Sequence, residues 1–95
     1  MSKSLHTLNT PPSDLNTLDL CLKALSDYDE LLLIENAVYF ALPIHRKKLP
    51  TNMIIHALSI DIEARGIKTD ESVVTINDAE FVNLTLRCDR VISWF

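Results

Sequence analysis

The chain has 95 residues, of which 47% are hydrophobic and only one is glycine. A chain of this length is expected to form one domain, residues 1–95, with a thin core, because folding at this size buries only about two-thirds of the surface that the unfolded chain exposes. Its net charge of −4 and its nine Lys and Arg residues argue against direct binding to nucleic acid or to an anionic membrane, since such binding depends on many cationic contacts to phosphate.

Neither a membrane span nor an export signal is expected. No apolar run approaches the roughly 20 residues that cross a bilayer, and residues 1–16 (MSKSLHTLNTPPSDLN) are too polar for a signal peptide. We therefore expect a cytoplasmic protein, in which thiols stay reduced. Cys21 and Cys88 lie far apart without CxxC spacing, so neither a disulfide framework nor a zinc site is expected.

The first half of the chain alternates between strand and helix patterns. Residues 4–8 (SLHTL) predict a strand that ends before two prolines, which cannot continue a strand ladder. A helix follows with Ser13 as its N-cap and with an apolar stripe at helical spacing, formed by Leu15, Leu18, Leu22 and Leu25. Residues 30–36 (ELLLIEN) form a continuous apolar run, which is typical of a strand buried on both faces.

The second half continues this alternation. Residues 37–42 predict a short helix, and the following segment, PIHRKKLPTN at 43–52, predicts a loop between two prolines. Strands are predicted at 53–58, 73–76 and 90–95, the last as a strand or an extended tail. One helix between them runs from the cap Ser59 to the stop signal Gly66, and another covers residues 78–88.

The alternation of strands and helices predicts an α/β fold with a mostly parallel sheet of about five strands. Right-handed crossovers place helices on both faces of such a sheet, which gives three α/β/α layers. Ligand and reaction sites in these folds gather at the carboxyl ends of the strands. Here those ends fall at residues 9–13, 35–37, 59 and 77.

Several common types of site are missing from the sequence. A single glycine excludes a P-loop and a GxGxxG fingerprint, and no Ser-His-Asp order with a nucleophile elbow is present. The carboxylates are scattered, and His6, His45 and His56 lack the spacing of metal ligands. We therefore expect no cofactor and no metal. We interpret His6 and His56, which fall within predicted strands, as hydrogen-bonded structural residues and His45 as a solvated one.

Cys21 is the one candidate for a reactive group. On a helical wheel it lies about 80° from the centre of the leucine stripe, at the border of the core. A reactive thiol needs a pKa that a helix N-terminus or a nearby cation lowers, whereas Cys21 lies two turns into its helix. The residues alone favour a structural cysteine here. They also favour a structural Cys88, which falls on the Phe81/Leu84 stripe of the last helix.

Two predicted helices carry a second apolar face that a monomer would leave in water. Leu20 and Ala24 lie about 140–180° from the start of the leucine stripe, and Val82 and Leu86 lie on an edge of the last helix away from its core stripe. Such faces on a small protein favour subunit contacts. Trp94, near the end of the chain, fits either an interface or burial against its own sheet.

Residues 45–48 (HRKK) form the one basic cluster of the chain. The cluster fits a solvated loop. It also fits a docking patch for an acidic protein or a minor contact to RNA within a larger assembly.

Four segments give the chain a resemblance to the TusB/DsrH family of small sulfur-relay proteins. They are LHTL at 5–8, DELLLIENAVYFAL at 29–42, IHALSIDIEARGI at 55–67 and INDAEFVNLTLRCDRVISWF at 76–95. Each segment is mostly apolar, so the specificity lies in their order and spacing along nearly the whole chain. One departure is Glu35-Asn36, where family members often carry an Asp-Gly turn; Asn36 is able to adopt the left-handed backbone of such a turn.

The resemblance implies a DsrEFH-like fold and membership of a TusBCD-like sulfur-transfer complex. That complex is a heterohexamer, a dimer of trimers with TusC-like and TusD-like subunits. It relays persulfide sulfur to a TusE-like carrier and then to the enzyme that forms 2-thiouridine at the wobble position of tRNA. For this chain the resemblance implies an accessory, non-catalytic subunit rather than the main sulfur carrier.

Two alternatives stay open. DsrH-like members in sulfur oxidisers carry a cysteine in the first helix, a place that Cys21 matches, and there it would be a persulfide site. Without the resemblance, the residues also fit an α/β homo-oligomer with a purely structural role.

Overall fold

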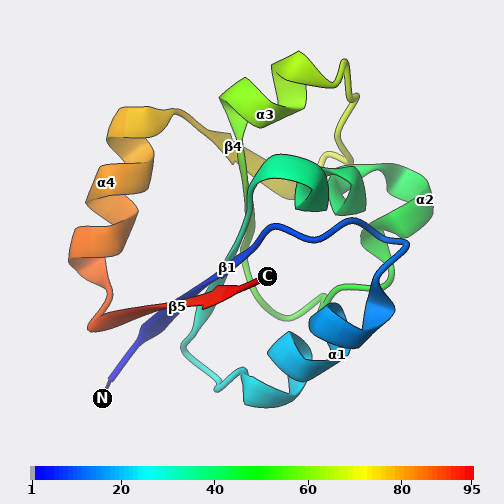
Figure 1. The fold of residues 1–95 in the computed structure, drawn as a ribbon. Coiled ribbons are helices and arrows are strands. Elements are labelled where there is room, and N and C mark those ends of the chain that lie inside the picture. The colour runs from blue at the N-terminus through cyan, green and yellow to red at the C-terminus, as the bar shows by residue number, and fades with distance from the viewer. Residues whose placement is uncertain (1) are drawn as a thin grey trace.

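Strands and helices alternate along residues 2–95, the part of the chain that the computed structural model describes; Met1 lies outside it (Figure 1). The strands are β1 (Ser4–Leu8), β2 (Glu30–Leu33), β3 (Ile55–Leu58), β4 (Val73–Ile76) and β5 (Arg90–Trp94). The helices are α1 (Leu15–Ala24), the 3-10 helix η1 (Glu35–Ala41), α2 (Pro43–Arg46), α3 (Ser59–Ala64) and α4 (Asp78–Arg87). Within residues 2–95, no helix has both the length and the apolar character needed to cross a membrane.

The five strands form one parallel sheet in the order β4-β3-β2-β1-β5. The chain steps along the sheet from β1 to β4 and then returns to place β5 on the other side of β1. Because crossovers between parallel strands are right-handed, the outward steps put α1, η1, α2 and α3 on one face and the return step puts α4 on the other (Figure 1). This arrangement confirms the predicted three-layer α/β/α fold.

Each face of the sheet has its own apolar core. The larger core includes buried residues of α1, η1 and α3, and the smaller one includes Leu84 of α4. β2 serves both cores, because Leu31 and Leu33 point to one face and Leu32 to the other. All four residues of β2 are buried. This burial on both faces explains the unbroken apolar run in the sequence.

Two predicted boundaries in the first half of the chain are wrong. β2 ends at Leu33 instead of continuing to residue 36, because Glu35 turns the chain with a φ of 51°. The N-cap of α1 is Asp14 and not Ser13. The Asp14 carboxylate accepts a hydrogen bond from the backbone N–H of Thr17 at 3.3 Å, which satisfies one of the free donors of the first turn.

The loop predicted at residues 43–52 contains the short helix α2. Pro43 begins this helix, because a proline fits the first turn, where no backbone N–H donor is needed. β3 begins at Ile55 rather than at residue 53. Ser59 is the first residue of α3 rather than its cap, and Gly66, with a φ of 60°, follows the end of α3, as predicted.

Buried hydrogen bonds join β1, β5 and the turn before β2. The Asp29 carboxylate accepts from the backbone N–H groups of Ser4 and Ser26, both at 3.0 Å, and from His6 Nε2 at 2.8 Å. Trp94 Nε1 donates to His6 Nδ1 at 3.0 Å, so His6 is the neutral tautomer with its proton on Nε2. This cluster fixes the end of β5 beside β1. It also confirms the interpretation of His6 as a hydrogen-bonded structural residue.

The Asp29 carboxylate makes stability depend on pH. Burial raises its pKa, but the hydrogen bonds from Ser4, Ser26 and His6 outweigh burial and hold the pKa below the ordinary value. A lowered folded-state pKa means that the stabilisation is complete above the unfolded value of about 3.9 and is lost as pH falls through the folded value.

We predict that Asp29→Asn lowers the free energy of unfolding by about 1–3 kcal/mol at pH 7, because it weakens several buried hydrogen bonds. The difference from the wild type should stay constant down to about pH 5 and shrink below about pH 4. Urea unfolding followed by circular dichroism measures this. Asp27→Asn, which changes an exposed carboxylate in the same turn, should have little effect. A deficit in Asp29→Asn that persists undiminished at pH 3 contradicts the assignment.

Glu35 holds a left-handed backbone at the carboxyl end of β2. Its N–H donates to Asp61 Oδ2 at 2.7 Å, which fixes the turn into η1. The sequence placed this conformation on Asn36; the structure places it on Glu35 instead. A side chain with a Cβ is strained in this region, whereas glycine is not.

We predict that Glu35→Gly is more stable than Glu35→Ala by about 1 kcal/mol, since both lose the carboxylate and only alanine keeps the strain. At Asn36, whose φ is not positive, the alanine variant should be more stable than the glycine variant, because glycine loses more backbone entropy on folding there. Thermal unfolding of the four variants measures both differences. Equal stability of the two Glu35 variants would show that the left-handed turn is absent in solution.

Candidate functional site

Cys21 lies wholly within the larger core, with 0% of its surface exposed. The sequence placed it at the border. The difference arises because the buried arc of α1 is centred on Leu18 and Cys21, whereas Leu15, at the start of the helix, is 50% exposed. Burial raises the pKa of the Cys21 thiol to about 12. At pH 7 roughly one molecule in 10⁵ therefore carries the thiolate, the form that attacks sulfur.

Cys88 follows α4 and packs against the smaller core, where it is half-buried. Burial raises the pKa of its thiol, and the nearby Glu30 carboxylate raises it further. A raised pKa disfavours the nucleophilic form. The cations Lys3 and Arg87 lower the pKa of Cys88, but burial and Glu30 outweigh them, so in this conformation neither cysteine has the lowered pKa of a reactive thiol.

The second apolar faces of α1 and α4 point into solvent. On α1, Leu20 is 59% exposed and Ala24 is exposed as well. On α4, Val82 is 56% and Leu86 is 78% exposed. Because α1 and α4 cover opposite faces of the sheet (Figure 1), these side chains form two separate apolar surfaces.

Trp94 differs from the other four residues that the sequence assigned to an interface. It is half-buried, it packs against the larger core, and its indole N–H donates to His6. Part of the side chain therefore closes the fold of its own chain. The next residue, Phe95, is 84% exposed and is the large apolar group at this end of β5.

Glu30 is a buried carboxylate at the centre of an ionic cluster beneath α4. Its carboxylate lies 2.7 Å from Lys3 Nζ, 2.8 Å from His56 Nε2 and 3.5 Å from an Arg87 guanidinium nitrogen. Burial raises the pKa of Glu30, but these basic neighbours outweigh it and hold the pKa below the ordinary value. Through Arg87, this carboxylate attaches the last turn of α4 to the sheet. Because it stays ionised, it has no proton to donate and is a poor general acid.

The sequence reading missed this cluster, because it described the carboxylates as scattered. Asp29 and Glu30 are adjacent in the chain, but their side chains lie on opposite faces of the sheet. Each binds a histidine more than 20 residues away in the sequence. Sequence spacing does not reveal such partners. One signal in the sequence could have revealed the cluster: two acidic residues stand at the start of an apolar run that predicts a buried strand. Buried charges need partners, so these carboxylates predict basic or hydrogen-bonding neighbours. His56 is hydrogen-bonded in its strand, as expected.

The basic cluster 45–48 is only partly solvated. Arg46 donates to the Ser72 hydroxyl and to two backbone carbonyls, so it holds the end of α2 in place. His45 is half-buried and lies edge-on to Phe40, which corrects the expectation of a solvated side chain. Within residues 2–95, no three His, Cys, Asp or Glu side chains gather as metal ligands do.

Comparisons with known proteins agree with this fold. The model of the family described as "DsrH like protein" matches residues 10–91. Protein TusB of Pectobacterium atrosepticum is 39% identical over 98 residues, covering 95% of this chain and 99% of that protein. Protein TusB of Escherichia coli is 31% identical over 97 residues with the same coverage.

Two solved structures share the architecture. The ychN protein from E. coli matches with a TM-score of 0.76 at 19% identity, over 99% of this chain and 100% of that one. Protein Tm0979 from Thermotoga maritima matches with a TM-score of 0.67 at 24% identity, over 88% and 92%. These likenesses show the fold alone. The family match and the relatives that align along nearly the whole chain establish that this chain belongs to the TusB/DsrH family.

Proposed function

We propose that the chain is a subunit of a TusBCD-like sulfur-transfer complex that relays persulfide sulfur for 2-thiouridine formation at the tRNA wobble position. Its likeness to TusB proteins supports a place in this relay. The burial of Cys21, with a thiol pKa raised to about 12, is the observation that supports an accessory role rather than that of main sulfur carrier. The chain itself would then perform no catalytic step and need no cofactor.

The proposed assembly is a heterohexamer, a dimer of trimers with TusC-like and TusD-like subunits, which passes sulfur to a TusE-like carrier in the cytoplasm. The exposed apolar surfaces on α1 and α4 support this arrangement, because a subunit with two different neighbours needs two separate contact surfaces. Trp94 and the adjacent Phe95 extend the apolar area at the end of β5. The net charge of −4 fits contact with protein partners better than direct contact with tRNA.

The first alternative is a DsrH-like subunit of a sulfur-oxidation complex that uses Cys21 as a persulfide site. The position of Cys21 in α1 favours this alternative, whereas its complete burial counts against it. A structural homo-oligomer is the second alternative, and it predicts assembly of the chain alone.

We predict that deleting the gene lowers wobble 2-thiouridine in the native cell and that the wild-type chain restores it. Leu20→Glu and Leu86→Glu each place a charge in a proposed contact surface, and burying an unpaired charge costs several kcal/mol. At least one of them should fail to co-purify the other subunits and fail to restore thiolation. Nucleoside analysis of tRNA and tagged pull-downs measure these effects.

Thr51→Glu changes an exposed residue of a polar turn that belongs to neither helix. It is the control and should assemble and complement normally. Circular dichroism of the isolated variants checks that the monomer stays folded. Normal thiolation after gene deletion would exclude the proposed function. Normal assembly of both leucine variants would show that the second apolar faces of α1 and α4 are not the contact surfaces.

A second prediction concerns the thiol. After incubation with a persulfide donor, intact-mass spectrometry should show at most a weak adduct of one sulfur on Cys21, because the buried thiol stays protonated. Urea-unfolded chain should form the adduct readily and serves as the positive control. A fast, stoichiometric adduct on the folded chain that Cys21→Ser abolishes would favour the sulfur-oxidation alternative.

A further inference from the structure

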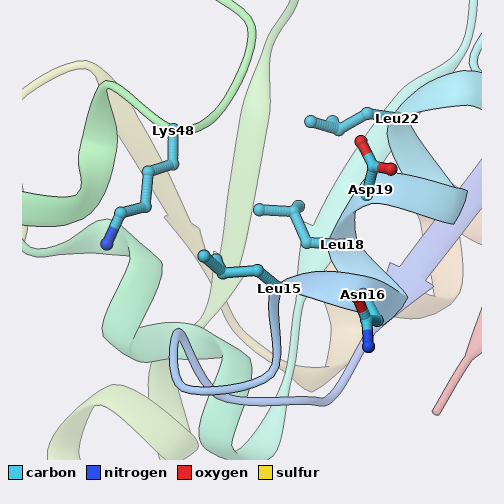
Figure 2. Close-up of a pocket in the computed structure, with 6 residues that line it drawn as sticks. All are labelled: Leu15, Asn16, Leu18, Asp19, Leu22 and Lys48. Atoms are coloured by element: carbon cyan, nitrogen blue, oxygen red, sulfur yellow. The ribbon is translucent and has the colours of Figure 1, made fainter.

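A hollow of about 370 Å³ lies between α1 and Lys48, in the segment that follows α2 (Figure 2). The wall formed by α1 is mainly apolar. Figure 2 shows three leucine side chains reaching from this helix toward the side on which Lys48 lies: Leu15, Leu18 and Leu22. Asn16 and Asp19 form the polar margin of the same wall.

The three leucines have the spacing of one helical face. From Leu15 to Leu22 the face extends about 10 Å, or two turns of helix. Leu15 is 50% exposed and Leu22 is half-buried, whereas Leu18 between them is buried in the larger core. The accessible part of this face therefore consists of Leu15 and Leu22. A second helix laid along it would bury these groups, which is the geometry by which an amphipathic helix binds in a groove.

The opposite wall supplies a positive charge that has no carboxylate partner within residues 2–95. The Lys48 ammonium donates to His45 Nδ1 at 2.8 Å and forms no ion pair with any residue among 2–95. The carboxylate across the hollow is already used, because Asp19 pairs with Lys23 at 3.0 Å. Lys47 adds an exposed cation beside Lys48. A local positive site in a chain of net charge −4 favours an acidic occupant.

We propose that this hollow binds an acidic amphipathic helix of a partner protein. Apolar side chains of that helix pack on the accessible Leu15 and Leu22, and one of its carboxylates pairs with Lys48. This surface is separate from the one proposed for subunit contact on the same helix, since Leu20 lies about 160° around α1 from Leu18. The hollow therefore stays open when Leu20 is covered, and the proposal stands whether or not the relay function does.

The test uses the full chain with labelled leucine methyl groups and two capped helical peptides. Both peptides have the same leucine pattern; one carries glutamates at all other positions and its counterpart carries lysines. NMR titration should show saturable shifts of the Leu15 and Leu22 methyls with the glutamate peptide. Binding of the lysine peptide should be at least tenfold weaker, because its charges meet Lys48 and Lys47.

Two matched pairs of variants locate the site. Lys48→Glu should weaken binding of the glutamate peptide at least tenfold. Lys68→Glu makes the same charge change at an exposed lysine elsewhere in the chain and should change binding less than threefold. Leu15→Ser should weaken binding, and Leu20→Ser should not. Each substituted leucine is at least half exposed, so the chain should remain folded.

Several results would overturn the proposal. One is equal binding of the two peptides, which would show that the charge of Lys48 plays no part. Another is the absence of shifts at millimolar peptide, or shifts confined to other leucines. A third uses single-stranded RNA as the probe and a chain whose backbone amides are also labelled: amide shifts of Lys47 and Lys48 with RNA, and none with the glutamate peptide, would make the basic cluster an RNA contact.

Discussion

The position of β5 depends on one buried carboxylate. Three of the five residues of β5 are exposed, so apolar burial alone does little to hold this strand at the edge of the sheet. Its attachment comes from pairing with β1 and from the bond between Trp94 and His6, which Asp29 orients. Because α4 leads directly into β5, the same cluster also sets where α4 lies on the second face.

Glu30 performs the corresponding task on the other face. Successive residues of a strand point to opposite sides, so Asp29 serves the face covered by α1 and Glu30 the face covered by α4. Each carboxylate is ionised and surrounded by donors or cations. Charges that are satisfied in this way stabilise the fold rather than take part in proton transfer. The buried polar groups at the start of β2 therefore stabilise the fold, and the proposed function rests on the surface of the chain instead.

That surface presents exposed apolar side chains of α1 and α4 and the two cations Lys47 and Lys48. Leu20 and Leu86 lie on helices that cover opposite faces of the sheet, and the leucines beside Lys48 lie on a third side. A small domain that exposes such large side chains in several directions is suited to simultaneous contacts with several proteins. In the same molecule Cys21 is shielded from every one of these contacts, because the sheet and α1 enclose it. The exposed apolar surfaces and the Cys21 thiol are thus separated in space.

The sequence predicted the architecture well because the signals for it are local. Unbroken apolar runs such as β2, helical spacing of leucines and the stop at Gly66 each follow from the backbone geometry of a single element. The same reasoning placed Leu20, Ala24, Val82 and Leu86 on outward faces, where the structure exposes them.

Features that depend on distant partners could not be predicted in this way. The contacts of Asp29 with His6 and of Glu30 with His56 join residues 23 and 26 positions apart. The burial of Cys21 depends on how α1 lies against the sheet, which a helical wheel does not contain. The hollow beside Lys48 brings α1 together with a residue that follows α2, in a segment that the sequence predicted as a loop.

The central claim is that this chain contributes its surfaces and not a thiol. The most direct measurement is the wobble 2-thiouridine content of tRNA in native cells whose only copy of the gene carries Cys21→Ser and Cys88→Ser together. A subunit that acts through its surfaces should maintain the wild-type level of 2-thiouridine. A loss of 2-thiouridine, while the double variant stays folded and bound to its partners, would contradict the claim and make a cysteine of this chain part of the relay.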